Sequence, residues 1–334
     1  MIRIAVDAMG SDEFPKPDVI GSVMAAREYG VEVLLVGDKA LIDPVLTAQN
    51  PGNLPVRVIH APEMVGMEDK GDALVLKARH KDAQYSMAVG MDLVKNGEAD
   101  AFVTAGNTGA AWVTAFFRLG RLRGVSKPAL AVIFPTAKGR CIVMDIGANP
   151  DCEPENLVQF AKMGSIYAEK VRGVKNPRVG LVSNGEEEGK GNKLVRETTP
   201  LIKDAGLNFI GNVEGKEVIG GAVDVAVTDG FTGNVILKVS EAISKLIMDK
   251  IKSAIKGGGP LANIGGLLVK PALSSLKDML DPSQEGAAPL LGVNGLVFIG
   301  HGRSDELAIK NAVRVASEAV RSGVLDSIKS NIAG

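Results

Sequence analysis

Short hydrophobic runs alternate along the chain with segments of helical periodicity. Most runs are continuously apolar, as expected for strands that are covered on both faces of a parallel sheet. We expect strands at Ile2–Val6, Val31–Val36, Val56–His60, Ala101–Thr104, Ala129–Phe134, Cys141–Met144, Val179–Ser183, Phe209–Gly211, Val225–Thr228 and Leu296–Ile299. No linker divides the chain cleanly. The pattern predicts one α/β domain over residues 1–334, with a mainly parallel, doubly wound sheet between two layers of helices.

Composition and charge narrow the classes of function. The 334 residues are 46% hydrophobic, and 38 basic against 39 acidic residues give a formal charge of −1, so no global field favours nucleic acid. Two cysteines and three scattered histidines show no disulfide framework and no metal-ligand spacing. The chain opens directly into a strand, and no run approaches the roughly 20 apolar residues of a spanning helix. We expect a cytoplasmic protein without a metal or another cofactor.

Polar, glycine-containing turns follow several of the predicted strands. The run Asp100–Gly109 (DAFVTAGNTG) is matched by Asp224–Gly233 (DVAVTDGFTG) at Asp, Val, Thr, Gly, Thr and Gly. Three further strands end in similar turns, at Asp7–Asp12, Asp145–Asn149 and Asn184-Gly185. Ligands of open α/β sheets bind where strands end, and helix N-terminal amides attract anions. The turns predict a shared anion site at the carboxyl edge of the sheet.

The turns match neither a Walker A loop nor a GxGxxG fingerprint, which argues against nucleotide hydrolysis and dinucleotide binding. Lys190 follows an acidic run and Lys238 follows Asn234, so either lysine could partner a phosphate or simply be solvated. His301, between two glycines at a strand end, either lines the site or is structural.

Taken together, the motifs resemble the bacterial phosphate acyltransferase family of phospholipid synthesis, in the family's order over nearly the whole chain. The matching stretches are Asp7–Gly10, Ala105–Ala110, Asp145–Asn149, Gly185–Glu187, Lys190–Asn192, Asn208–Glu214, Asp229–Asn234 and Ala288–Gly292. The resemblance implies a three-layer α/β/α fold like that of isocitrate and isopropylmalate dehydrogenases and phosphotransacetylases.

The resemblance also implies an activity and partners. A fatty acyl group would pass from acyl carrier protein to inorganic phosphate, and the acyl phosphate would feed a membrane-bound glycerol-3-phosphate acyltransferase. A homodimer associated with the inner face of the membrane is implied as well. Two positions depart from the family pattern: Ser11 replaces a glycine, and Glu285-Gly286-Ala287 replaces Tyr-Gly-Gly. The Ser11 hydroxyl could still donate to phosphate, whereas Glu285 would place a carboxylate near an entrance.

The chemistry of this reaction suits such a site without a Ser-His-Asp or Cys-His set. Phosphate is largely a dianion near neutral pH, and a simple thiolate leaves with a pKa of roughly 8.5. The tasks left to the site are to hold two anions together and to stabilise a developing oxyanion. Backbone amides together with a lysine can do both. We expect Lys190 and Asn234 to be catalytic. The expected phosphate ligands are Gly10, Gly106, Asn107, Thr108, Gly147 and Asn149, and the secondary contacts are Asp7, Asn192, Asp229 and His301. Arg118, Arg121 and Arg123 could dock the acidic carrier or form an exposed helix end.

One segment departs from the alternation of strands and helices. Apolar residues between positions 239 and 255 lie on one face of a predicted helix, with lysines at other positions. Gly257–Pro260 must break that helix, and a second apolar segment continues to Leu280. We expect a helical hairpin subdomain over residues 239–281. The hairpin could be an element of the core or of a dimer interface. Its tip could instead touch membrane or guide an acyl chain, and the two interpretations are compatible.

Three rival functions stay open. A phosphotransacetylase would use an acyl-coenzyme A donor. A decarboxylating dehydrogenase of the related fold would need a divalent metal, for which Asp224 and Asp229 are the obvious carboxylates. A membrane scaffold, suggested by the hairpin, would bind lipid without turnover.

Overall fold

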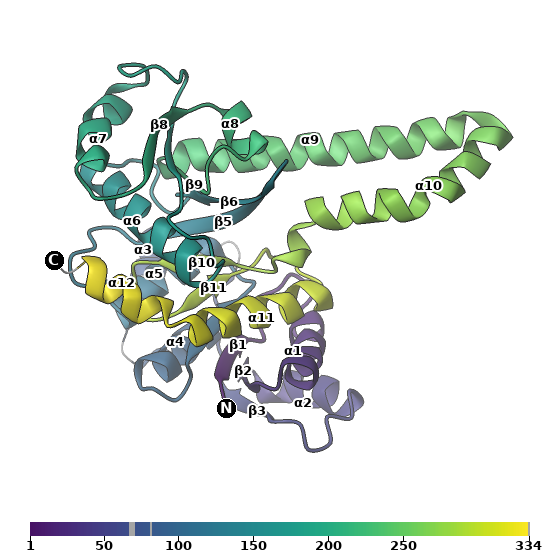
Figure 1. Ribbon diagram of the computed structural model, residues 1–334. Helices are drawn as coiled ribbons and strands as arrows, with labels where there is room; N and C mark the ends of the chain where they lie inside the picture. The colour runs from purple at the N-terminus through teal and green to yellow at the C-terminus, as the bar shows by residue number, and fades with distance from the viewer. Residues whose placement is uncertain (67–70, 81, 333–334) are drawn as a thin grey trace.

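The computed structural model describes residues 1–66, 71–80 and 82–332. In this part of the chain, eleven strands form one sheet in the order β3-β2-β1-β4-β11-β10-β5-β6-β9-β7-β8 (Figure 1). The strands are β1 (Arg3–Asp7), β2 (Glu32–Gly37), β3 (Val56–His60), β4 (Ala101–Thr104), β5 (Ala129–Thr136), β6 (Gly139–Met144), β7 (Val179–Val182), β8 (Phe209–Val213), β9 (Val225–Val227), β10 (Ala288–Leu291) and β11 (Val297–Ile299).

Each of the ten expected strands is present, with ends shifted by a few residues. The missed strand is β10, which pairs antiparallel with both β11 and β5. Its sequence, APLL, is short and contains Pro289, a residue that cannot donate to a ladder and therefore argues against an interior strand.

The sheet consists of two parallel sets joined through antiparallel strands. β3, β2, β1, β4 and β11 form one set, and β6, β9, β7 and β8 form the other. The pairings β11–β10, β10–β5 and β5–β6 are antiparallel, so the two sets run in opposite directions. The expectation that all polar turns share one carboxyl edge is therefore wrong, because each set has its own.

Helices cover both faces of the sheet. They are α1 (Lys16–Tyr29), α2 (Lys39–Ala48), α3 (Gly71–Arg79), α4 (Ser86–Lys95), α5 (Thr108–Arg118), α6 (Pro154–Lys170), α7 (Lys193–Lys203), α8 (Gly215–Gly220), α9 (Gly230–Gly257), α10 (Gly259–Leu280), α11 (Glu306–Ser322) and α12 (Val324–Ile332). Successive residues of β1 point into different hydrophobic clusters: Ile4 and Val6 belong to the cluster that includes residues of α1 and α11, whereas Ala5 belongs to the cluster that includes residues of α4. This alternation confirms the three-layer α/β/α fold.

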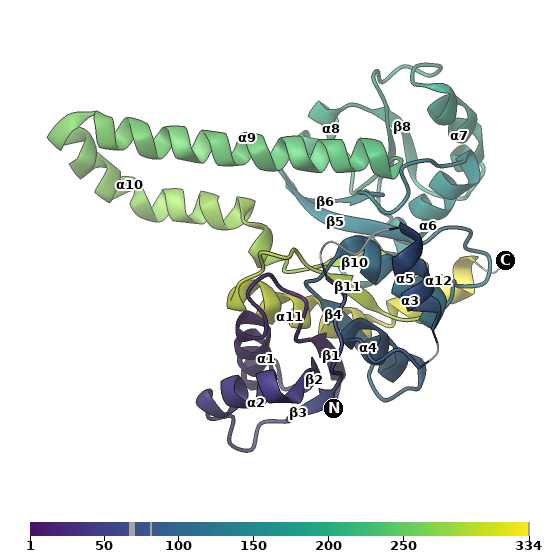
Figure 2. The same ribbon diagram turned by 180° about the vertical axis from the view of Figure 1, so that it is seen from behind.

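A long helical pair projects from the sheet (Figures 1 and 2). α9 begins at Gly230, before the predicted segment, and ends at Gly257. The chain turns at Gly258, where a glycine-rich break was expected, and α10 returns alongside α9. The protruding hairpin is thus confirmed, while its status as a separate subdomain stays a prediction. Within the described residues, no helix is both long enough and apolar enough to cross a membrane.

Candidate functional site

Two neighbouring turns meet at the carboxyl edge of the first set of strands. The buried carboxylate of Asp7, at the end of β1, accepts a hydrogen bond from Thr104 Oγ1 at 2.7 Å. Thr104 Oγ1 in turn accepts from the amide of Gly106 at 3.0 Å. Burial raises the pKa of Asp7. Asp7 therefore positions the Gly106 turn through the hydroxyl of Thr104. The amide of Gly106 already has an acceptor within the protein.

Close backbone approach explains the glycines of these turns. A Cβ on Gly10 would lie 2.9 Å from the Gly106 amide nitrogen, and a Cβ on Gly106 would lie 2.4 Å from Met87 Cε. The Gly10 contact is with backbone, so a side chain at Gly10 would displace the Gly106 turn, whereas the Gly106 contact is with the flexible end of the Met87 side chain. The sequence placed Gly10 and Gly106 in one site, and the structure brings them together.

The Gly106 turn leads into an exposed helix N-terminus. Asn107 caps α5, its Oδ1 accepting from the amide of Ala110 at 3.0 Å, and Thr108 is exposed in the first turn. Gly300 donates to the carbonyl of Thr104 at 2.7 Å, which places the turn carrying His301 beside them. Asp7, Gly10, Gly106, Asn107, Thr108 and His301 thus form one group, which we call the α5 cluster.

A second group surrounds the start of α9. Asp229 caps this helix, since its Oδ1 accepts from the amide of Thr232 at 2.8 Å. A Cβ on Gly233 would lie 1.8 Å from the carbonyl oxygen of Asp145, so the first turn of α9 packs directly on the turn after β6. A Cβ on Gly147 would lie 3.6 Å from Asn234 Cγ, and both residues are exposed. We call Gly147, Asn149, Asp229 and Asn234 the α9 cluster.

Asn149 holds this cluster together. Its Nδ2 donates to the carbonyl of Pro128 at 2.7 Å and to Asp145 Oδ2 at 2.9 Å, and its carbonyl accepts from the amide of Gly230. Asp145, fully buried and with its pKa raised by burial, also accepts from the backbone of Leu130. Because both hydrogens of the Asn149 amide are used, this side chain positions the turn and offers no donor to a phosphate.

α9 connects the two clusters across the sheet. Lys238 and Glu241, in the third and fourth turns of α9, lie close enough to act electrostatically on His301 of the α5 cluster. Burial is the largest cause that lowers the pKa of His301, and the charges of Arg303 and Lys238 add to it. The helix that begins in the α9 cluster therefore brings charged side chains near the α5 cluster.

Lys190 and Asn192 lie in a third place, the turn after β7. Asn192 caps α7 by accepting from the amide of Val195 at 3.0 Å, and Asn184 Oδ1 accepts from the amide of Gly191 at 2.9 Å. Lys190 is exposed, and its Cγ would touch a Cβ on Gly185 at 3.0 Å. The structure records no contact between these described residues and Asn234. Lys190 therefore shares a sheet edge with the α9 cluster without joining it.

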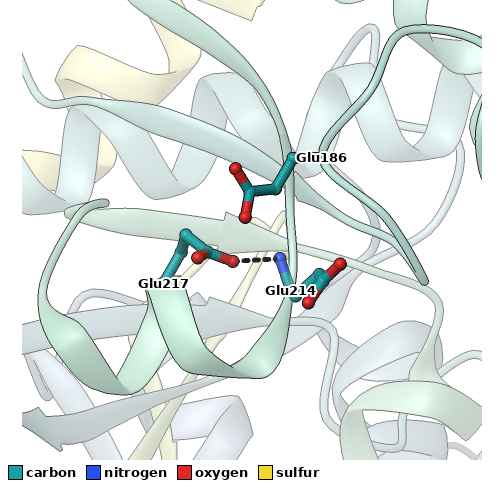
Figure 3. Close-up of side chains that lie close together, drawn as sticks. All are labelled: Glu186, Glu214 and Glu217. Atoms are coloured by element: carbon teal, nitrogen blue, oxygen red, sulfur yellow. Dashed lines mark hydrogen bonds between the residues drawn. The ribbon is translucent and has the colours of Figure 1, made fainter.

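Three carboxylates lie together beside this turn, those of Glu186, Glu214 and Glu217 (Figure 3). Lys216 Nζ lies 2.7 Å from Glu186 and within 3.6 Å of the other two, so an ammonium group already neutralises the cluster. Glu217 Oε2 also accepts from the backbone amide of Glu214, capping α8. The arrangement is that of an ion-pair network.

The carboxylates expected for a dehydrogenase metal do not converge. Asp224 precedes β9 and Asp229 follows it, a separation of about 16 Å along an extended chain. Arg178 binds Asp224 at 2.9 Å and lowers its pKa despite partial burial, while Asp229 caps α9.

The departures from the family pattern also have structural outcomes. The Ser11 hydroxyl donates to buried Asp18 at 2.5 Å, which turns it away from a phosphate. Glu285 lies between Arg140 at 3.4 Å and Arg172 at 3.8 Å with its side chain 15% exposed, so it is paired inside the protein. Arg118 is buried against Asp92 and the carbonyl of His80, which excludes it from carrier docking.

Sequence reasoning missed Thr104 and the central role of Asp145. Both are polar residues at the carboxyl end of an apolar strand, and both are fully buried. Their position at a strand end could have indicated this role, because a polar side chain there is buried only when neighbouring turns supply its hydrogen-bond partners.

The fold has solved counterparts. A phosphotransacetylase from Streptococcus pyogenes superposes with a TM-score of 0.63 at 15% identity, covering 96% of this chain and 94% of that one. A 4-hydroxythreonine-4-phosphate dehydrogenase from Klebsiella pneumoniae gives 0.56 at 13% identity, covering 96% and 100%. The chain is thus an α/β/α protein of the fold that phosphotransacetylases and these dehydrogenases share.

Sequence relatives identify the family. The family model described as fatty acid synthesis protein matches residues 2–327. The phosphate acyltransferase of Elusimicrobium minutum is 46% identical over 333 residues, covering 99% of this chain and 96% of the relative. That of Geotalea uraniireducens is 49% identical over 327 residues, covering 97% and 92%. The chain belongs to the phosphate acyltransferase family, and it is an acyltransferase that forms acyl phosphate.

Proposed function

We propose that the acyl donor is fatty acyl-acyl carrier protein and that the reaction takes place between the α5 and α9 clusters. One observation carries this proposal: two glycine turns each enter a capped helix N-terminus. Thr108 is exposed in the first turn of α5, and Asn234 is exposed at the start of the second turn of α9. Helix N-termini stabilise anions through free amides and the helix dipole. The reaction must hold a phosphate dianion and a developing oxyanion at the same time.

In the proposed reaction, a phosphate oxygen attacks the thioester carbonyl carbon. The C–O bond forms, the C–S bond breaks, and the carrier's thiolate leaves, so no redox partner is needed. The first turn of α5, with Asn107 and Thr108, would hold the phosphate. Gly147 and Asn234 would face the thioester oxygen. Asn149 would hold the turn that carries Gly147 in place, and Asp7 would hold the turn that carries Gly106.

The role of Lys190 is a separate part of the proposal. Its flexible side chain is exposed near the α9 cluster, and an ammonium group suits a phosphate as a point charge. Asn192 and Gly191 fix the turn on which Lys190 stands. We assign Lys190 to neutralising the bound phosphate once substrate is present.

The hairpin serves dimerisation and membrane contact in this proposal. Apolar side chains of α9 and α10 face solvent, among them Ile243 at 50%, Leu246 at 56% and Leu268 at 77% exposure. Lys245, Lys250, Lys252 and Lys256 lie among them. The base would pair with a second copy, and the tip would lie on an anionic lipid surface of the inner membrane face. Acyl phosphate would there reach a membrane-bound glycerol-3-phosphate acyltransferase.

The decisive experiment measures acyl phosphate formation from palmitoyl carrier protein and inorganic phosphate, with palmitoyl-coenzyme A beside it. Product that requires both phosphate and the carrier thioester supports the donor assignment. Preference for the coenzyme A thioester would favour a phosphotransacetylase-like donor. Folded protein that binds lipid but gives product with neither donor would overturn the proposal in favour of a scaffold.

A further inference from the structure

A small pocket lies beside the α5 cluster and shares Gly10 with it. Its volume is about 180 Å³. Met9, Phe14 and the residues Gly10–Asp12 form one wall, and Met64 and Val65 form the other. The pocket therefore opens between the turn after β1 and the segment that follows β3.

The pocket is continuous with the place where phosphate would bind. Gly10 belongs to its wall, and the Gly10 Cα lies 3.4 Å from the position of a Cβ on Gly106. The turn of Gly106 leads directly into α5. A group held at the N-terminus of α5 is thus adjacent to the mouth of the pocket.

The far wall of the pocket is anchored by hydrogen bonds. Glu63 donates its amide to the carbonyl of Gln84 and accepts from the amide of Ser86 at 3.0 Å. Lys77 Nζ donates to the carbonyl of Met64 at 2.9 Å. These bonds tie Met64 and Val65 to the elements around α4, so the pocket is a built feature of the fold.

The lining indicates the chemistry of the occupant. Two methionines, a phenylalanine and a valine offer an apolar and adaptable surface, because thioether side chains fill irregular space. Ser11 and Asp12 are the polar residues of the lining; the Ser11 hydroxyl already donates to Asp18, and Asp12 is exposed. One water molecule needs at least about 10 Å³ of such volume, so the pocket has room for several groups of methylene size. The pocket thus accommodates a run of methylenes.

We propose that this pocket binds the carbonyl-proximal methylenes of the fatty acyl chain and makes Met64 and Phe14 determinants of acyl specificity. The inference rests on the proposed function, since it requires a fatty acyl thioester at the α5 cluster. An extended carrier arm is the other occupant to consider, and its amides need hydrogen-bond partners. Met9, Phe14, Met64 and Val65 supply none and the Ser11 hydroxyl is engaged by Asp18, which leaves the exposed Asp12 as the one available polar side chain among the described lining residues.

The test compares Met64→Trp, which fills the pocket from its half-exposed wall, with Leu41→Trp on exposed α2 as the matched control. Acyl phosphate formation is measured with palmitoyl and acetyl thioesters of the carrier. Because excluding even one methylene is worth roughly tenfold, Met64→Trp should lower kcat/KM for palmitoyl by at least about that factor. Acetyl transfer should change little, and Leu41→Trp should leave both donors unchanged.

A second measurement keeps the proposal testable if Met64→Trp folds poorly. Wild-type protein is photolysed with a palmitoyl carrier thioester that holds a diazirine near the carbonyl, and labelled peptides are mapped. Labels at Met9–Phe14 or Met64-Val65 support the pocket. The pocket assignment would be overturned if labels were confined to α9 and α10, or if a diazirine in the carrier arm labelled the pocket residues. It would also be overturned if Met64→Trp lowered kcat/KM equally for the palmitoyl and acetyl donors. Failure of wild-type protein to form any acyl phosphate would instead refute the proposed function.

Discussion

Asp18 should make the stability of this protein fall as pH rises from about 4 to about 7. Asp18 lies in the first turn of α1, is fully buried, and accepts from Ser11 at 2.5 Å, while its Oδ1 has no partner among the described residues. Burial, reinforced by the nearby charge of Asp7, raises the pKa of Asp18 from 3.8 to about 7. The folded protein therefore holds a proton that the unfolded chain releases.

The sign and size of the effect follow from linkage. Between the two pKa values the folded state binds more protons, so stability falls with rising pH until the folded carboxyl also ionises near pH 7. A shift of this size corresponds to at most about 4 kcal/mol, of which about 2.5 kcal/mol is lost between pH 5 and pH 8.

The assay is urea unfolding at pH 5 and pH 8 for wild type, Asp18→Asn and, as control, Asp12→Asn in the exposed part of the same turn. Asp18→Asn places an unpaired amide where Oδ1 was, which lowers stability by about 1–3 kcal/mol at both pH values. The pH-dependent loss should nevertheless shrink by about 2.5 kcal/mol relative to wild type. An unchanged pH dependence in Asp18→Asn, or an equal change in the control, would refute the reasoning.

Three further predictions concern the site. Gly233→Ala drives a Cβ to within 1.8 Å of the Asp145 carbonyl and should lower the free energy of unfolding by about 3 kcal/mol or more in chemical denaturation. Gly257→Ala, which meets open space in the same helix, should instead be neutral or stabilising by up to ~1 kcal/mol. Lys190→Ala should reduce kcat at least about tenfold with an unchanged circular dichroism spectrum. Lys193→Ala serves as its control, and an unaltered kcat in Lys190→Ala would remove that residue from the mechanism. Asn149→Ala should lower both stability and kcat because two buried acceptors lose their donor; loss of kcat with full stability would argue for direct phosphate contact.

Local signals in the sequence were sufficient for most of the framework. Continuous apolar runs identified ten strands, because strands covered on both faces need apolar residues at every position. The break at Gly257–Pro260 marked the tip of the hairpin, since glycine and proline end helices locally. The β10 strand escaped because its neighbours β11 and β5 supply the pairing, and nothing within APLL indicates it.

Some features of the candidate site could likewise be predicted from the sequence, whereas others could not. The glycine turns were predicted from the sequence. Asn107, Asn192 and Asp229 were expected as phosphate or secondary contacts, and the structure shows that each caps a helix by accepting from a backbone amide three residues away. The use of Asn149 as a support could not be predicted, since its partners Pro128 and Asp145 come from different turns.

The sequence by itself thus determined most of the elements, the family and the glycine turns, because all of these depend on short-range patterns. Only the tertiary structure decided that the two sets of strands oppose each other and that α9, which begins beside Gly147, brings Lys238 near His301. Strand direction depends on pairing between distant segments, which leaves no periodic trace in either strand. The same long-range packing buried Asp18 and turned Ser11 toward it.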